Sequence, residues 1–215
     1  MADTTAVIVL AAGKGSRFQG SEGGAGGAHK LAQRLGDSSV LAQTLANALS
    51  SRLPVVVVTT EAFADVARGS VATRDVIVLP EVGTGGAKPL GMGVSIAVGV
   101  GARPHAPGWL VLPGDMPLVR PATLQAVARG LEHHSVVYAQ HRGRRGHPVG
   151  FAAELYSELV GLSGDEGARR LISRYPAFGV ELDDPGILVD IDTPGDLEAV
   201  RRDIAAAHSG ARVMP

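Results

Sequence analysis

The sequence contains no cysteine among its 215 residues. This absence excludes disulfide bonds, zinc–thiolate sites, cysteine-ligated iron–sulfur clusters and thiol nucleophiles. Aromatic residues are also scarce, at 4% of the chain, although hydrophobic residues make up 45%. The core must therefore be built mainly from Val, Leu, Ile and Ala.

The chain also lacks an excess of charge of either sign. Lys and Arg number 20 against 21 Asp and Glu, so the formal net charge is −1. Domains that bind nucleic acid normally carry a basic face, and this balance argues against that class. The first residues lack the basic start of a signal peptide, and no apolar run reaches the ~20 residues that span a bilayer. We expect a cytoplasmic protein that contacts neither nucleic acid nor membrane.

Short β-branched runs alternate with helical patterns along the chain, which predicts an α/β fold with a mostly parallel sheet and helices on both faces. The length suits one domain, which we assign to residues 1–207, with a flexible C-terminal tail at 208–215. The predicted strands are nearly continuous apolar runs. They are Ala6–Ala11, Val55–Thr60, Val76–Leu79, Trp109–Leu112, Val136–Ala139 and Ile187–Ile191.

Three helix starts can be read from the capping residues. Ser38 and Ser39 precede a stripe of leucines, Pro121 suits a first helical turn, and Thr193–Pro194 opens the last helix. The acidic run that begins at Gly164 resembles a fourth helix start, with acids near the positive end of the dipole.

The first predicted strand runs directly into a glycine-rich turn, Leu10-Ala11-Ala12-Gly13-Lys14-Gly15-Ser16-Arg17. Such a turn exposes successive backbone N–H groups to an anionic ligand, and Lys14 and Arg17 add two cations. A dinucleotide-binding fingerprint fails because Phe18 replaces its third glycine, and a Walker loop is absent. An ordinary strand-to-helix turn is the alternative, but the two basic residues favour phosphate binding.

Aspartates follow two of the predicted strands. Asp115 stands between Pro113 and Pro117 after the central strand, and Asp190 and Asp192 follow the last one. Mg²⁺ needs one or two carboxylates together with phosphates and waters, so these residues are candidate ligands. The alternatives are a turn aspartate at 115 and a cap of the last helix at Asp192 or Thr193. The local sequence leaves open which of Asp190 and Asp192 is the second ligand.

Several of these motifs resemble the MobA-like NTP transferases. The resemblance rests on Leu-Ala-Ala-Gly-x-Gly-x-Arg at 10–17, Lys30-Leu31, and Gly-Asp-Met-Pro at 114–117. Four further segments resemble the molybdenum cofactor cytidylyltransferases within that family: 91–95, 146–151, 164–169 and 190–194. The matches run in order from Val7 to about Val200. The resemblance implies a single Rossmann-like nucleotidyltransferase domain.

The resemblance also implies a reaction and roles for named residues. CTP and a molybdopterin-type cofactor would give the cytosine dinucleotide form of the cofactor and pyrophosphate, for delivery to a recipient molybdoenzyme. Asp115 and Asp192 would hold Mg²⁺, Lys14 and Arg17 would bind the β- and γ-phosphates, and Lys30 would reach the α-phosphate. The implied nucleotide-binding residues are Leu10, Ala11, Ala12, Gly13, Gly15, Gly91 and Ser95.

The acceptor side is less sharply marked. His147 and Arg145, near Arg142 and Arg144, suit a cofactor that carries a phosphate and an electron-rich pterin. The alternative is a surface loop with solvated arginines. The chain departs from the family pattern in its glycine-rich insertion at 19–28 and its long stretch at 81–90, both beside the implied nucleotide site.

The base preference and the acceptor have competing interpretations. Guanylyl-transferring relatives tend to open with Leu-Ala-Gly-Gly and carry Asp-Lys-Gly, whereas this chain has Leu-Ala-Ala-Gly and His29-Lys30-Leu31. Cytidine is therefore preferred over guanosine. One alternative is transfer to a sugar phosphate or another phosphorylated alcohol, and a second is a non-catalytic carrier of molybdenum cofactor. The carrier would not need Lys14, Arg17, Lys30 and Asp115 together.

Overall fold

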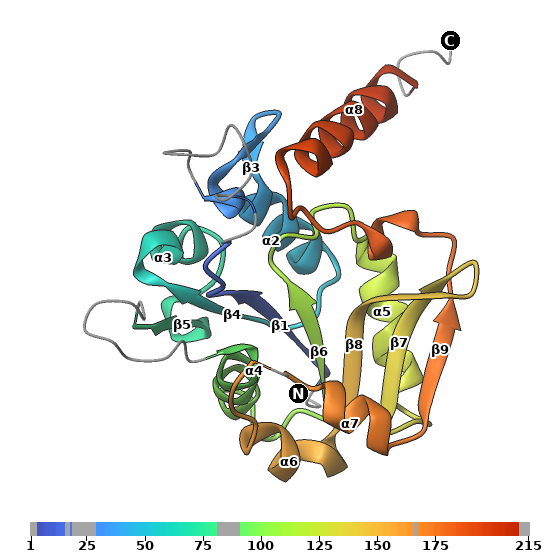
Figure 1. Ribbon diagram of the computed structural model, residues 1–215. Coiled ribbons are helices and arrows are strands. Elements are labelled where there is room, and N and C mark those ends of the chain that lie inside the picture. Colours follow the sequence, from blue (N-terminus) through green and yellow to red (C-terminus); the bar gives the residue numbers. More distant parts are fainter. Residues whose placement is uncertain (1–3, 16–17, 19–28, 81–90, 166, 211–215) are drawn as a thin grey trace.

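The computed structural model describes residues 4–15, 18, 29–80, 91–165 and 167–210, with side chains up to residue 206 (Figure 1). Arg17 and the insertions at 19–28 and 81–90 lie outside these residues. No helix in the described part of the chain is both long and apolar enough to cross a membrane.

A seven-stranded sheet forms the centre of the described structure, with strand order β5-β4-β1-β6-β8-β7-β9. Only β8 runs antiparallel to its neighbours, so the predicted mostly parallel α/β fold is confirmed. The strands are β1 (Ala6–Ala11), β4 (Val55–Thr60), β5 (Val76–Leu79), β6 (Gly108–Pro113), β7 (Val136–His141), β8 (Arg144–Ala152) and β9 (Ala177–Glu181). A small hairpin pairs β2 (Arg34–Leu35) with β3 (Ser38–Ser39).

Helices cover both faces of this sheet because its strands are apolar on both sides. Along β1, Val7 and Val9 belong to one half of the core and Ile8 to the other. The first half contains α2 (Val40–Ser50), α3 (Glu61–Arg68), α5 (Pro121–Gly130) and α8 (Pro194–Gly210), and the second contains α4 (Gly91–Gly101), α6 (Tyr156–Val160) and α7 (Arg169–Arg174). Short 3-10 turns are η1 (Lys30–Ala32), η2 (Thr73–Asp75), η3 (Ala153–Leu155) and η4 (Pro185–Leu188).

Two sequence predictions were wrong. The strand expected at Ile187–Ile191 is instead η4 followed by irregular chain, because Asp184 accepts a hydrogen bond from Gly186 N and starts a 3-10 turn. The helix start expected at Gly164 is a turn: Gly164 has a φ of +70°, and α7 begins only at Arg169. Strands β8 and β9 were not predicted.

The helix starts of α2, α5 and α8 lie where their capping residues predicted them. Ser39 Oγ accepts a hydrogen bond from Ala42 N at the start of α2, and Pro121 occupies the first turn of α5. Thr193 and Asp196 cap α8 reciprocally: Asp196 N donates to Thr193 Oγ1, and Thr193 N donates to Asp196 Oδ2. Helix α8 runs through Gly210 and so extends beyond residue 207.

Helix α4 approaches the sheet closely at a glycine. A Cβ added at Gly99 would lie 2.3 Å from Ile8 Cγ2 and 3.1 Å from Val58 Cγ2. Both partners are buried β-branched residues in interior strands, so they have little freedom to move aside. Gly101, in the same helix, would have nothing within 4 Å of an added Cβ.

These two glycines give a matched test of the packing. We expect Gly99→Ala to lower the free energy of unfolding by about 1–3 kcal/mol through overpacking, against any gain in helix propensity. Gly101→Ala should leave stability unchanged or raise it by up to about 1 kcal/mol. Urea unfolding followed by circular dichroism measures both, and equal effects in the two variants would contradict the close contact.

Candidate active site

The turns after β1 and β6 meet at the carboxyl edge of the sheet, where open α/β folds bind ligands. Gly114 N donates a hydrogen bond to Leu10 O over 2.8 Å. A Cβ at Gly114 would come within 3.0 Å of that same oxygen, so the close approach favours glycine. Ala11 is buried, and Ala12 is half-buried where the chain leaves the sheet.

Helix α2 holds the loop that carries Asp115. Thr44 Oγ1 donates to Gly114 O over 2.9 Å, and Asn47 Nδ2 donates to Pro117 O over 2.8 Å. Polar residues on an apolar helix face were the available sequence signal for this support, which was not predicted. The carboxylate is therefore positioned by contacts on both sides as well as by the flanking prolines.

Lys30 brings two of the predicted metal ligands together. Its Nζ lies 2.6 Å from Asp115 Oδ2 and 2.7 Å from Asp192 Oδ1. The three side chains come from η1, the loop after β6 and the segment before α8. Burial alone would lower the pKa of Lys30, but the charges and hydrogen bonds of Asp115 and Asp192 outweigh it and raise that pKa above its usual value.

One oxygen of this cluster suits a further cation. Asp115 Oδ1 is buried and accepts no hydrogen bond from any described residue. An unsatisfied buried carboxylate oxygen is costly unless a ligand completes it. No group of three or more His, Cys, Asp and Glu side chains in the described residues could hold a metal alone. Asp115 and Asp192 thus fit an ion that takes its remaining ligands from phosphates and water.

The structure distinguishes Asp190 from Asp192. Of the two residues expected as a possible cap of the last helix, Thr193 caps α8 together with Asp196, whereas the Asp192 carboxylate contacts Lys30. Ile191 is buried, and its N donates to Asp115 O over 3.1 Å, which places Asp192 beside the β6 loop. Asp190 is exposed.

The glycine-rich turn is linked to Lys30 through a residue that sequence reasoning did not assign to the site. His29 Nε2 lies 2.9 Å from Gly13 O, and its Nδ1 accepts a hydrogen bond from Leu31 N over 3.2 Å. Burial lowers the pKa of His29, which favours the neutral ring that this pattern needs. Lys14 is exposed on the turn, and Gly15 has a φ of +61°.

The predicted acceptor residues lie on β8. His147 is half-buried; burial lowers its pKa, although the charges of Asp115 and Asp190 act to raise it. Arg145 is exposed, with its guanidinium carbon 4.2 Å from the centre of the Tyr138 ring. The charge of Asp115 acts on His147, whereas the described contact of Arg145 is with Tyr138.

A two-residue β-turn, Arg142–Gly143, connects β7 to β8. Arg142 and Gly143 have φ values of 51° and 74°, as tight hairpins require. Glu181 on β9 accepts hydrogen bonds from both of their N–H groups, at 2.5 Å and 3.3 Å.

Gly91 and Ser95, which were predicted to bind the nucleotide, lie in the first turns of α4. Gly91 has a φ of +76°, and an added Cβ would lie 2.3 Å from Gly164 O. Gly93 N donates to that same oxygen over 2.9 Å. Ser95 is buried. Two of the segments that carry the family resemblance, at 91–95 and 164–169, therefore pack directly on each other.

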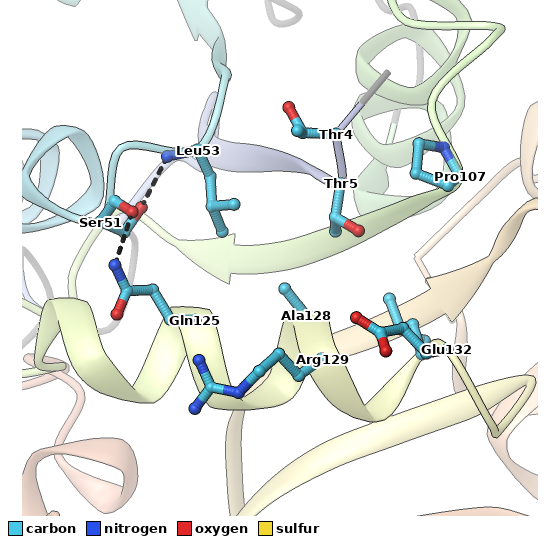
Figure 2. Close-up of a pocket in the computed structure, with 10 residues that line it drawn as sticks. Thr4, Thr5, Ser51, Leu53, Pro107, Gln125, Ala128, Arg129 and Glu132 are labelled. Atoms are coloured by element: carbon cyan, nitrogen blue, oxygen red, sulfur yellow. Dashed lines mark hydrogen bonds between the residues drawn. The ribbon is translucent and has the colours of Figure 1, made fainter. Parts of the chain in front are cut away.

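A cavity of about 510 Å³ lies away from this cluster (Figure 2). Thr4 and Thr5 precede β1 and Pro107 precedes β6, so the cavity lies at the amino edge of the sheet. In Figure 2, the Gln125 amide points to Ser51, to whose carbonyl it donates a hydrogen bond of 3.0 Å. None of the predicted site residues lines it.

Residues 7–178 match the MobA-like NTP transferase domain. The chain is 32% identical, over 210 residues, to the purine catabolism protein PucB of Bacillus subtilis (strain 168), and the match covers 91% of this chain and 95% of PucB.

Solved structures agree with this match. A nucleotidyl transferase from Methanothermobacter superposes with a TM-score of 0.75 at 26% identity, covering 95% of this chain and 99% of that one. Rv0371c from Mycobacterium tuberculosis H37Rv gives a TM-score of 0.75 at 25% identity, with 93% and 98% covered. Molybdopterin-guanine dinucleotide biosynthesis protein A from Archaeoglobus fulgidus shares the fold, with a TM-score of 0.65 at 18% identity and 94% and 100% covered.

The ion cluster of Lys30, Asp115 and Asp192 should contribute to the stability of the fold. The side chains of Lys30, Asp115 and Asp192 are only 13%, 15% and 25% exposed, so Lys30→Met would leave two poorly hydrated carboxylates facing each other. We expect a loss of about 2 kcal/mol in the free energy of unfolding at pH 7. Urea unfolding of wild type and variant measures it.

The pH dependence of that difference follows from the raised pKa of Lys30 in the folded state. The contribution is fully present below the unfolded value of about 10.4 and is lost as the pH rises through the folded pKa. The wild type and variant should therefore converge in alkaline solution. A difference that stays constant from pH 7 to pH values well above 10.4 would contradict the ionic origin.

Proposed function

The chain belongs to the MobA-like NTP transferase family, and we propose that it transfers CMP from CTP to a molybdopterin-type cofactor and releases pyrophosphate. Family membership and the nucleotidyltransferase fold support nucleotidyl transfer. The CTP preference rests on Ala12 and on His29-Lys30-Leu31, which differ from the guanylyl-transferring pattern. The relation to PucB leads us to propose a recipient enzyme in purine catabolism.

The observation that carries the proposal is the position of Lys30. Its ammonium lies between two carboxylates at the carboxyl edge of the sheet, and His29, beside it, contacts the glycine-rich turn. A cation, two anionic oxygens and a turn with exposed N–H groups are the components that position a nucleoside triphosphate. A non-catalytic carrier would not need this combination.

The transfer itself requires little from the protein beyond positioning and charge neutralisation. A terminal phosphate oxygen of the acceptor attacks the α-phosphorus of CTP, the bond from that phosphorus to the bridging α,β-oxygen breaks, and pyrophosphate leaves with that oxygen. Lys30 would stabilise the negative charge that develops on the α-phosphate, and Lys14 would stabilise the leaving group. Arg17 joins Lys14 in this role by family resemblance. The acceptor phosphate is ionised at neutral pH, so no general base is needed.

We propose that Asp115 and Asp192 hold a Mg²⁺ ion when the nucleotide binds. The unsatisfied Asp115 Oδ1 and the adjacent Asp192 support this assignment. When bound, the ion would neutralise phosphate charge and polarise the reacting phosphoryl group. Rv0371c has been crystallised in complex with manganese, so Mn²⁺ is a suitable probe for the same question here.

The acceptor would lie on the β8 side of the cluster. His147 is half-buried within the electrostatic influence of Asp115, and its lowered pKa keeps the ring neutral at pH 7. A neutral imidazole can hydrogen-bond to a pterin edge or a phosphate oxygen without adding charge. Arg145 would supply the cation for the acceptor phosphate from the exposed part of β8.

Pyrophosphate release tests the proposed reaction. Purified protein, Mg²⁺ and molybdopterin cofactor are incubated in parallel with CTP, GTP, ATP or UTP. The proposal predicts release with CTP well above that with the other three. Release with GTP instead would overturn the base preference, and release with a sugar or alcohol phosphate but not with molybdopterin would overturn the acceptor.

Three aspartate variants test the site in the same assay. Asp115→Asn should lower the rate by at least about a hundredfold with the fold intact, because an amide replaces the buried carboxylate. Asp192→Asn should also lower it strongly, while the matched control Asp190→Asn should lose less than about tenfold, since Asp190 lies outside the Lys30 cluster. Near-normal turnover of Asp115→Asn with Mg²⁺ would refute the metal assignment.

A further inference from the structure

We propose that His29 is a positioning residue, which couples the phosphate-binding turn at residues 12–15 to the segment that carries Lys30. The inference rests on the proposed function, because that function assigns the turn and Lys30 to the nucleotide phosphates. His29 would not touch the substrate. It would set the relative position of two groups that do.

The coupling uses both nitrogens of one ring. Nε2 lies 2.9 Å from Gly13 O, and Nδ1 lies 3.2 Å from Leu31 N. A carbonyl oxygen only accepts and a backbone N–H only donates, so Nε2 must carry the proton and Nδ1 must be bare. The geometry therefore specifies one neutral tautomer, which joins two segments that are 16 residues apart in sequence.

The ring is also held by packing. Its centroid lies 4.8 Å from that of Phe63, a buried residue of α3, with 56° between the planes. On the side of the turn, a Cβ added at Gly15 would lie 2.8 Å from His29 Nε2. The imidazole thus fills the space between the turn and α3, and a larger residue at position 15 would displace it.

The second anchor bears directly on Lys30. Leu31 is buried in the core, and its N–H is held by the His29 ring. Lys30 therefore lies between an anchored ring and an anchored side chain, with its Nζ directed to Asp115 and Asp192. If the turn moved, the hydrogen bond to Gly13 O would move His29, and Lys30, the next residue in the chain, would move with it. Phosphate binding at the turn and the position of Lys30 are therefore linked.

Two substitutions separate the two ring contacts. The Asn Oδ1 stands as many bonds from Cα as Nδ1 does, so His29→Asn can still accept from Leu31 N but cannot reach Gly13. The Gln amide nitrogen stands as many bonds from Cα as Nε2 does, so His29→Gln can donate to Gly13 O but loses the contact with Leu31. His134→Asn is a matched control, because His134 stacks on Phe178 away from this turn.

The readouts are the Kd of the Mg²⁺–nucleotide complex, by calorimetry, and the single-turnover rate with molybdopterin at saturating nucleotide. The nucleotide is whichever one gives pyrophosphate release with wild type. We expect His29→Asn to raise the Kd about tenfold with a rate within about threefold of wild type, as the loss of one hydrogen bond implies. His29→Gln should leave the Kd within about threefold of wild type and lower the single-turnover rate about tenfold. His134→Asn should change neither the Kd nor the rate.

The outcomes separate this inference from the function on which it rests. Wild-type protein that binds no nucleoside triphosphate would overturn the proposed function and the coupling together. Wild-type binding with an unchanged Kd in His29→Asn, or the same rise in Kd and fall in rate in both variants, would overturn the coupling alone. Nitrogen NMR of the free protein at pH 7 gives an independent readout: the ring must carry its proton on Nε2, and a proton on Nδ1 would refute the geometry.

Discussion

The interaction on which the site depends is the contact of one lysine ammonium with two aspartates. Lys30 Nζ lies within 2.7 Å of both Asp115 and Asp192, and all three side chains are largely buried. Two ionised carboxylates that share one site repel each other, so a cation between them is needed to keep both charged at neutral pH. The Lys30 ammonium occupies that position. We propose that a metal bound with the nucleotide would neutralise the two carboxylates instead. The nucleotide phosphates would then attract the lysine. The charges that stabilise this cluster are thus those on which the proposed reaction would draw.

The fold serves this cluster by bringing distant segments to one edge of the sheet. The turn after β1 and the loop after β6 are joined through Leu10 and Gly114, and α2 fixes the β6 loop from the other side. The segment before α8 reaches Asp115 through the backbone of Ile191. Thr193 and Asp196 supply the side chains that cap α8, and the Asp192 carboxylate contacts Lys30. Each of these contacts is local, but together they position the side chains of Lys30, Asp115 and Asp192, which are remote in sequence.

The sequence was sufficient for those features that depend on local patterns. Buried parallel strands such as β1 and β4 are apolar for most of their length, and their predicted bounds were correct. Strand β8 was not predicted because its first half, Arg144–His147, is polar and carries no alternation of hydrophobic residues. The strand predicted at Ile187–Ile191 had the right composition, but β9 pairs with β7 instead and Pro185 begins a 3-10 turn. The roles of His29, Thr44 and Asn47 depend on tertiary contacts to backbone carbonyls, which no local pattern specifies.

We propose that the carboxylates of Asp115 and Asp192, which pair with Lys30, receive the metal when the nucleotide binds. Anomalous diffraction from a crystal grown with Mn²⁺ and CTP measures this directly. On this proposal, Mn²⁺ lies on Asp115 Oδ1 and on Asp192, and Lys30 Nζ is withdrawn from the two aspartates onto a phosphate oxygen. Mn²⁺ bound elsewhere, or a Lys30–Asp115 ion pair unchanged beside bound nucleotide, would contradict it.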